Sequence, residues 1–353
     1  EDYDNDGYPD TTVENCTTIL TLDLDDDNDG IIDIDDIFPL DACASEDYDN
    51  DSYPDSIIEN CITNLTADLD DDNDGFIDNL IGWNAHSNEG DIGVNLSLSH
   101  GTNVAGCVSS MTNNETGIAS VGWSIKIMGI TNCDPGGSIT SGYEGILTAA
   151  QMGADIINNS WGSSGGPDYA QALINTVLNE YTSLIVASSG NAGTNIANYP
   201  AAFEGVVSVT STSEGSVFSC WATRHETVDI AAPGDNVFTT TTSPNEGGFY
   251  YNYATGTSFS APIISGALGL LKSIYPDGDN TFLISKIKDN ANYYNDMDGN
   301  CNGENLNGLV GTGELNIREA IINPTPISLA VSNINVLSAT GNIIPGDTTE
   351  IIL

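Results

Sequence analysis

Basic residues are almost missing from this chain, which has 6 Lys and Arg against 51 Asp and Glu and a formal net charge of −45 over 353 residues. A protein that binds nucleic acid by neutralising phosphates needs the opposite charge balance, so that class of function is excluded. The same balance argues against docking on an anionic membrane surface. The sequence also lacks any apolar run of the roughly 18 residues that a membrane-spanning helix needs, so no membrane span is predicted.

Paired metal-binding cysteines are absent as well. Seven cysteines are spread through the chain and none forms a Cys-x-x-Cys pair, so a zinc site is not expected. In an acidic, lysine-poor chain, this cysteine usage favours an extracellular protein with some disulfides and at least one free thiol. We therefore predict a secreted protein, and the sequence leaves open which cysteines pair.

The acidic residues are concentrated at the start of the chain. Residues 1–80 hold 27 of the 51 acids and no basic residue, since the first base is Lys126. A segment with this charge repels itself unless something cationic binds it. The segment is also an internal repeat, because residues 1–16 recur almost unchanged at 46–61, with a shift of 45 residues.

Each copy of the repeat contains two Asp-x-Asp-x-Asp stretches followed by a further Asp. Carboxylates at alternate positions of a tight loop can converge on one hard cation, and a Gly at the sixth position permits the sharp turn that calcium loops need. Gly7, Gly30 and Gly75 meet this requirement, whereas Ser52 makes the third loop the weakest candidate. The four predicted ligand sets are Asp2, Asp4, Asp6 and Asp10; Asp25, Asp27, Asp29 and Asp33; Asp47, Asp49, Asp51 and Asp55; and Asp70, Asp72, Asp74 and Asp78.

These loops resemble thrombospondin type 3 repeats, and the resemblance implies Ca²⁺ as the bound ion. Their flanks are rich in Thr, Pro and Asx, so a helix–loop–helix calcium site is not expected. The alternative interpretation is a disordered acidic linker. We assign residues 1–78 to acidic thrombospondin type 3-like calcium-binding repeats, a loop-rich segment that has little apolar material to fold around without the ion.

From about residue 80 the chain alternates between apolar strand-like runs and helical patterns. This alternation predicts an α/β domain with a mostly parallel central sheet and helices on both faces. Parallel sheets place their functional sites at the carboxyl ends of the strands. The predicted strands are 124–130, 154–162, 183–191 and 205–212, and the predicted helices are 101–111, 141–153, 168–181 and 260–275.

Three residues in this part of the chain form a candidate catalytic set. His100 stands at a predicted helix start, and Asn191 lies in a Gly-flanked loop after a strand. Ser258 precedes an apolar helix, where backbone N–H groups and the helix dipole favour developing negative charge. Each motif alone is weak, but the three together, in this order, predict nucleophilic catalysis.

The motifs around these residues resemble those of the subtilisin-like serine protease family. They are HGTNVAG at 100–106, NNSWG at 158–162, ASSGN at 187–191 and GTSFSAP at 256–262. The resemblance implies a subtilisin-like three-layer fold and a serine endopeptidase that hydrolyses polypeptide substrates. It implies that Ser258 is the nucleophile, that His100 is the general base and then acid, and that Asn191 completes the oxyanion hole with the Ser258 N–H.

The resemblance also implies where a peptide substrate binds. The backbone of Ser160, Trp161 and Gly162 is expected to pair with the substrate as an added strand, and the segment that contains Gly136 and Gly137 is expected to form the opposite wall. The Trp161 side chain either narrows the first specificity pocket or simply packs in the domain, and the sequence favours neither interpretation.

The triad Asp of the family is not identifiable in this chain. In the family it ends an early apolar strand, as Asp-[Ser/Thr]-Gly, and no such segment precedes His100. Asp155 and Asp229 look structural, and Asp91 is a poor candidate. We therefore expect that the first strand was lost, and the alternative function is an inactive subtilisin-like fold that acts as a calcium-stiffened binding module.

The predicted domain organisation has three parts. Residues 1–78 are the calcium-binding repeats, residues 79–322 are the peptidase domain without its Asp-bearing strand, and residues 323–353 are a linker and the start of a truncated β-sandwich. The last part alternates like strands but is too short to bury a core by itself.

Overall fold

The computed structural model describes the central part of the chain. The residues that it describes are 82–90, 92, 99–123, 125–242, 250–293, 301 and 303–323. All four predicted calcium loops and the predicted β-sandwich segment lie outside these residues. Their assignment therefore stays a prediction.

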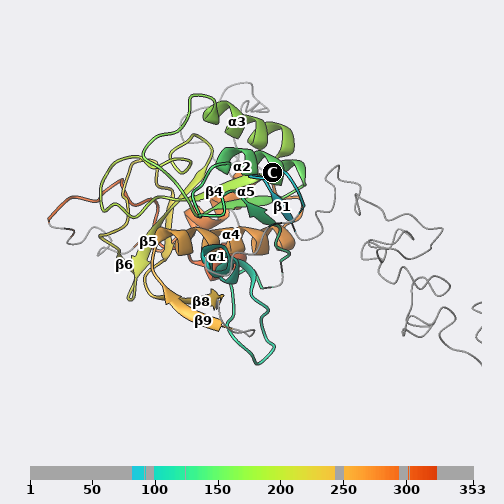
Figure 1. The fold of residues 1–353 in the computed structure, drawn as a ribbon. Helices are drawn as coiled ribbons and strands as arrows, with labels where there is room; N and C mark the ends of the chain where they lie inside the picture. Colours follow the sequence, from blue (N-terminus) through green and yellow to red (C-terminus); the bar gives the residue numbers. More distant parts are fainter. Residues whose placement is uncertain are drawn as a thin grey trace, which may run out of the picture.

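The described residues form alternating strands and helices, as the sequence pattern predicts (Figure 1). In chain order they are β1 (Gly82–Asn84), α1 (His100–Ser109), β2 (Gly129–Thr131), α2 (Gly142–Gln151), β3 (Ile156–Asn159), α3 (Ala170–Thr176), the π-helical turn η1 (Val177–Tyr181), β4 (Leu184–Ser188), β5 (Val207–Ser213), β6 (Val217–Phe218), β7 (Ile230–Pro233), β8 (Val237–Thr241), β9 (Tyr250–Ala254), α4 (Thr257–Ile274), α5 (Asn280–Asp289) and α6 (Ile317–Ile322).

The main sheet has five strands. Its order is β3-β4-β5-β6, and β7 also pairs with β5. The pairs β3·β4, β4·β5 and β5·β7 are parallel, and only the short β6 runs antiparallel. β4 is buried along its whole length, because parallel strands linked by helical crossovers are covered on both faces.

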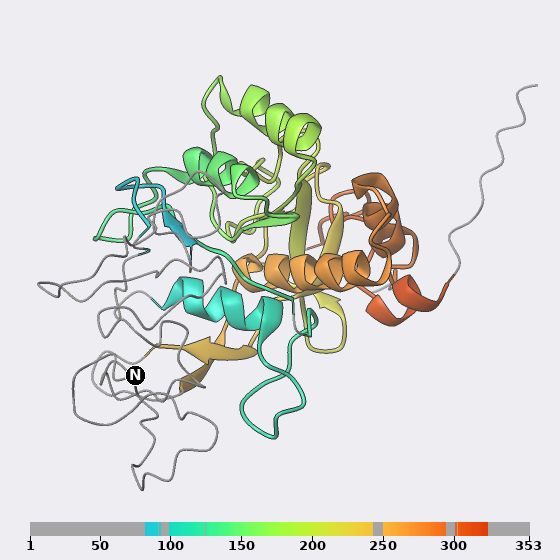
Figure 2. The same cartoon turned by 90° about the vertical axis from the view of Figure 1, so that its right-hand side faces the viewer.

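The side chains of β4 alternate between two hydrophobic cores. Leu184 and Val186 belong to a cluster with residues of α4, α5 and α6, while Ile185 and Ala187 belong to a cluster with residues of α2 and α3. Figure 2 shows this layering, with α4 along one side of the sheet and α2 and α3 on the other. The three-layer architecture predicted from the sequence is therefore the observed one.

A second, smaller sheet consists of β1 and β2, which pair in parallel. α2 contacts both β2 and β3, so one helix packs across the two sheets. Among the described residues, however, no strand joins β2 to β3. The expectation that a strand of the central sheet is missing from the peptidase domain stays a prediction, because residues 1–81 and 93–98 lie outside the described part of the chain.

Several element boundaries differ from the sequence prediction; the strand predicted at 154–162, for example, is only Ile156–Asn159. The strand predicted at 124–130 is only Gly129–Thr131, and Ile127 and Met128 are exposed rather than buried. An apolar run forms a strand only where a neighbouring strand takes its hydrogen bonds, and β1 pairs only with 129–131. The helix predicted at 260–275 begins earlier, at Thr257, which brings Ser258 into its first turn.

One disulfide joins two distant loops of the described chain, Cys220 and Cys301, while Cys107 and Cys133 carry free thiols. The sequence predicted this combination of bridged and free cysteines without naming the pair. No helix within the described segments has the length and apolar character that crossing a bilayer requires.

Candidate active site

The candidate catalytic residues come from four elements at one edge of the molecule. Ser160 follows the carboxyl end of β3, and Asn191 follows the carboxyl end of β4. His100 is the first residue of α1, and Ser258 is the second residue of α4, a helix that packs against α1, β3 and β4. The fold therefore gathers residues that are up to 158 positions apart in the chain, at the strand ends where α/β sheets carry their sites.

Ser258 and Ser160 hold each other through two hydrogen bonds. The Ser258 Oγ donates to the Ser160 carbonyl oxygen at 3.1 Å, and the Ser160 Oγ donates to the Ser258 carbonyl oxygen at 2.7 Å. The Asn158 amide donates to the Ser160 Oγ at 3.0 Å and accepts from the Ser265 Oγ at 3.0 Å. This chain of hydrogen bonds ties the end of β3 to the first turns of α4.

The Asn191 side chain is oriented by the residue before the nucleophile. Its Oδ1 accepts from both the N–H and the Oγ1 of Thr257, each at 2.9 Å. Because the oxygen takes both donors, the Nδ2 group faces the other way, and among the described residues it donates to nothing. Gly190 precedes Asn191 with φ +104°, a backbone conformation that suits Gly and turns the chain sharply out of β4.

His100 lies against the first turn of α4. Its ring centroid is 5.8 Å from that of Phe259, the residue after Ser258, at a tilt of 57°. His100 is an exposed residue, but partial desolvation of its ring lowers the pKa of His100 from 6.5. The imidazole is thus neutral at pH 7, the form that a general base needs, and within the described residues it makes no ion pair with a carboxylate.

Neither Asp155 nor Asp229 is placed to serve His100. Both precede their strands, β3 and β7, and so lie at the amino ends, opposite the candidate site. The Asp229 carboxylate pairs with Lys288 at 2.6 Å and accepts from the Ser208 N–H at 2.9 Å. Their interpretation as structural residues agrees with these positions, whereas Asp91 lies outside the described residues.

Of the predicted substrate-binding residues, Ser160 is hydrogen-bonded to the candidate nucleophile Ser258. The indole of Trp161 packs on α2, with its ring centroid 5.4 Å from that of Tyr143 in an edge-to-face contact. This contact favours the packing interpretation of Trp161. Gly162 is exposed and follows it directly, which leaves the strand backbone accessible at this point.

The segment predicted to form the opposite wall is a closed turn. Both Gly136 and Gly137 are exposed, but their N–H groups are already used, because they donate to the side chain and the carbonyl of Asp134 at 2.9 and 2.8 Å. A peptide could therefore pair with these two residues only through their carbonyl oxygens.

Several residues of the site were not found from the sequence. Thr257 orients Asn191, and Ser265 anchors Asn158. Thr223 makes three hydrogen bonds with residues 189–192, around Asn191, and a fourth with Thr210 of β5. Ser and Thr are common in this chain, so no local signal distinguishes these three. A group of three or more metal-ligating side chains does not occur in the part of the chain that the structure describes.

A parallel α/β sheet that carries a Ser at a helix start, a His on the neighbouring helix and an Asn at a strand end defines the class of serine-type endopeptidases with the subtilisin-like fold. The chain belongs to the subtilase family, whose model matches residues 54–313. This match starts inside the second copy of the acidic repeat and ends shortly before α6.

Relatives of the chain are serine proteases. It is 36% identical over 176 residues to thermitase of Thermoactinomyces vulgaris, a match that covers 49% of this chain and 61% of thermitase. It is 34% identical over 177 residues to halolysin of Haloferax mediterranei, covering 50% of this chain and 33% of halolysin. The chain thus spans about half the length of the curated relatives it matches.

Solved structures support the same family. Fervidolysin from Fervidobacterium pennivorans, a keratinolytic enzyme related to subtilisin, aligns with a TM-score of 0.58 and 26% identity over 70% of this chain and 40% of its own. A protease from Pseudoalteromonas arctica aligns with a TM-score of 0.55 and 27% identity over 63% of this chain and 70% of its own.

Proposed function

We propose that this chain hydrolyses peptide bonds through an acyl-enzyme on Ser258. The observation that carries the proposal is the orientation of Asn191, whose Oδ1 is taken by Thr257 while its Nδ2 group points away as an available donor. The Nδ2 group lies on the Gly256 side of the helix start, 3.4 Å from where a Gly256 Cβ would stand. An oxyanion that forms beside Ser258 can therefore accept from this amide and from the Ser258 N–H.

The proposed reaction follows from these positions. The Ser258 hydroxyl leaves the Ser160 carbonyl, gives its proton to the neutral His100 imidazole, and attacks the carbonyl carbon of the scissile bond. The tetrahedral intermediate collapses when His100 returns this proton to the leaving amine, which leaves the acyl group on Ser258. Water then attacks the acyl-enzyme, with His100 again as base, and releases the carboxylate product.

The substrate is proposed to be a polypeptide bound in extended form. Its backbone would pair with residues 160–162 as an added strand, because the end of β3 is accessible there. We further propose that the protein works outside the cell and that Ca²⁺ is held by the Asp loops of residues 1–78. Halolysin-like Nep of Natrialba magadii, named as extracellular, is 31% identical over 208 residues and supports the first of these two proposals.

A fluorophosphonate probe tests the proposal directly. The probe should label Ser258 in the full chain, and labelling should vanish in Ser258→Ala. Ser260→Ala, which changes a fully buried hydroxyl two residues away, is the matched control and should still be labelled. Equal labelling of Ser258→Ala would remove Ser258 from the mechanism.

A second candidate function is a peptide-binding module without turnover. It is favoured by one observation, the lack of a carboxylate beside His100 among the described residues. Peptide binding to the chain without any probe labelling would select this function over hydrolysis.

A further inference from the structure

A short segment distant from the nucleophile supports the loop that carries Asn191. We define the support segment as residues 219–224 and the Asn191 loop as residues 189–194. The Thr223 N–H donates to the Gly190 carbonyl at 2.7 Å, and the Thr223 carbonyl accepts from the Ser189 Oγ at 3.0 Å. The Thr223 Oγ1 also accepts from the Ala192 N–H at 3.4 Å, so one buried side chain and its backbone contact both sides of Asn191.

The rest of the support segment extends this contact. The Arg224 N–H donates to the Thr194 carbonyl at 3.0 Å, at the far end of the Asn191 loop. Gly193 lies so close to the support segment that a Cβ there would stand 3.1 Å from the Cys220 carbonyl oxygen. The Asn191 loop has no regular secondary structure, so these contacts and the Thr257 hydrogen bonds define its position.

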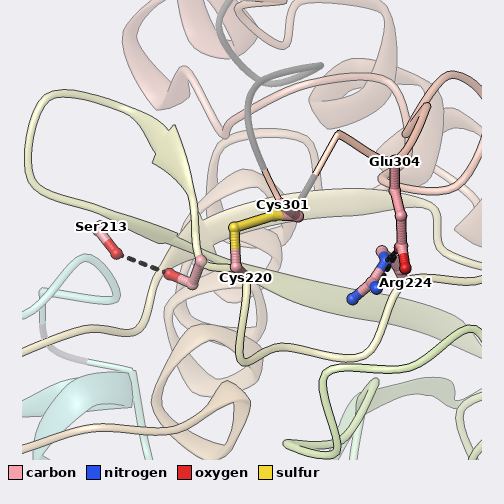
Figure 3. Close-up of a disulfide and its surroundings, with 6 residues drawn as sticks. Ser213, Cys220, Arg224, Cys301 and Glu304 are labelled. Atoms are coloured by element: carbon pink, nitrogen blue, oxygen red, sulfur yellow. Dashed lines mark hydrogen bonds and ion pairs between the residues drawn. A yellow bond between two sulfur atoms is a disulfide. The ribbon is translucent and has the colours of Figure 1, made fainter.

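The support segment is itself linked to two residues distant in the chain, Cys301 and Glu304. Cys220 forms the disulfide with Cys301, and the buried Arg224 pairs with Glu304 through an Nε–Oε2 hydrogen bond of 2.7 Å. Figure 3 shows both links side by side. Trp221, between them, packs against the buried cluster that includes Cys301 and Leu306.

We propose that these two links, here called the clamp, position the Asn191 amide for oxyanion stabilisation. Thr223 is the positioning residue through which the clamp acts on the Asn191 loop. The clamp consists of the Cys220–Cys301 disulfide and the Arg224–Glu304 pair. An oxyanion donor works only when it is fixed before the reaction, and a displacement of about 1 Å can cost about a hundredfold in rate. Opening the clamp frees the support segment, and the Asn191 loop then loses the contacts with Thr223 and Arg224 that fix its position.

The inference rests on the proposed function. A kinetic measurement and a hydrogen-exchange measurement together distinguish failure of the inference from failure of that function. The variants are Cys220→Ser with Cys301→Ser, and Thr223→Val with Thr223→Ser as its conservative counterpart. Cys133→Ser, which removes a free, half-exposed thiol, is the matched control. All are assayed as full chains, and active sites are counted with the fluorophosphonate probe.

The kinetic test measures kcat per titrated site, KM, and the affinity of a peptide aldehyde, whose hemiacetal oxygen uses the oxyanion donors. We expect kcat and aldehyde affinity to fall together by about ten- to a hundredfold in the double Cys variant and in Thr223→Val. KM should change less than twofold, and Thr223→Ser and Cys133→Ser should keep wild-type values. A merely structural clamp would lower the number of titrated sites and leave kcat per site unchanged, and that result overturns the inference.

Amide hydrogen exchange tests the clamp without requiring turnover. Exchange of Ala192 and Arg224 should accelerate at least about tenfold in the double Cys variant, while α2 keeps its protection. Unchanged exchange at these two amides overturns the inference even if the enzyme is active. Faster exchange in a chain whose Ser258 is never labelled supports the clamp and rejects the proposed hydrolysis.

Discussion

At the scale of single residues, the proposed nucleophile Ser258 is held in place by hydrogen bonds that do not involve His100. The Ser258 hydroxyl donates to the Ser160 carbonyl, and the position of Ser160 depends on Asn158 and Ser265. Asn158 is thus a link between the end of β3 and the first turns of α4.

Asn158→Ala should lower kcat/KM about tenfold, because it removes two hydrogen bonds of about 1 kcal/mol each and frees the Ser160 side chain. Ser265→Ala removes only one of the two and should have a smaller effect. Peptide turnover measured per labelled active site checks both variants. A kcat/KM of Asn158→Ala within twofold of wild type would contradict the linking role.

The lowered pKa of His100 predicts the pH dependence of activity. Because desolvation holds this pKa below 6.5, the imidazole stays neutral and able to act as a base somewhat below pH 6.5. The acid limb of kcat/KM should therefore lie below pH 6.5, and a limb at or above pH 7 would show that a carboxylate raises the pKa. The native state binds fewer protons than the unfolded one below pH 6.5, so this residue lowers the free energy of unfolding as the pH falls through that range.

At the scale of elements, α4 joins the site to the core. Its first turn carries Thr257 and Ser258, and its later residues Ile264, Leu268 and Leu271 are fully buried against the sheet. Two glycines in the middle of α4 let α1 and the 122–125 segment approach closely. A Cβ on Gly266 would stand 2.8 Å from the Val108 carbonyl oxygen, whereas one on Gly269 would meet the end of the Ile125 side chain at 2.7 Å.

These two glycines give a matched pair of substitutions. Ala is favoured over Gly inside a helix by about 1 kcal/mol, but Gly266→Ala would force the α1 backbone away, which typically costs about 1–3 kcal/mol. We expect Gly266→Ala to lower the free energy of unfolding by up to about 2 kcal/mol, which is the difference between these two effects. Gly269→Ala should be neutral or stabilising, because the Ile125 side chain can rotate aside. Urea unfolding of both variants checks the difference, and equal stability of the two would contradict the close helix contact.

The elements were predictable from the sequence where the signal is local. α2 and β5 lie within two residues of their predicted ranges, and β4 falls inside a longer predicted range, because their apolar residues repeat with the period of a helix or a buried strand. His100, Asn191 and Ser258 stand in short motifs at element ends, which made them recognisable. Thr223 could not be found, because its contacts join positions 31 and 34 residues apart, and such pairings leave no periodic trace.

At the scale of the whole molecule, the chain combines a packed domain with a highly charged segment. Residues 1–80 carry 27 acids and no base, so the remaining 273 residues hold 51 − 27 = 24 acids with all 6 bases. Mutual repulsion among carboxylates at this density opposes any compact arrangement of the segment unless divalent cations bind.

Calcium should therefore change the full chain measurably. We expect heat of binding in isothermal titration, and a circular dichroism spectrum that differs between calcium and chelator. Asp72→Asn, in a loop with the required Gly, should reduce binding more than Asp49→Asn, whose loop has Ser52 at the turn position. Identical spectra in both conditions, with no heat of binding, would reject the calcium interpretation.

The place between the β1·β2 sheet and the main sheet bears on both stability and catalysis. Within the described residues β2 and β3 lie under the same helix without a strand between them, and His100 lacks a carboxylate. An unfilled strand position would leave backbone donors and acceptors without partners, which lowers the stability of a sheet. The triad Asp orients the imidazole and stabilises its protonated form. In subtilisin itself, where the effect was measured, its loss lowers kcat by about 3 × 10⁴, which is about 6 kcal/mol.

We therefore expect this chain to cleave peptides slowly and to gain from one defined insertion. A variant with an apolar strand that ends in Asp-Ser-Gly, inserted before Phe76, should raise both peptide turnover and Tm. The same insertion ending in Asn-Ser-Gly is the matched control, because it fills the sheet equally and lacks the carboxylate. It should raise Tm alone, which separates the structural effect of the strand from the catalytic effect of the acid. If the unmodified chain already turns over peptides as fast as the Asp variant, another carboxylate serves His100 and the missing-strand interpretation is wrong.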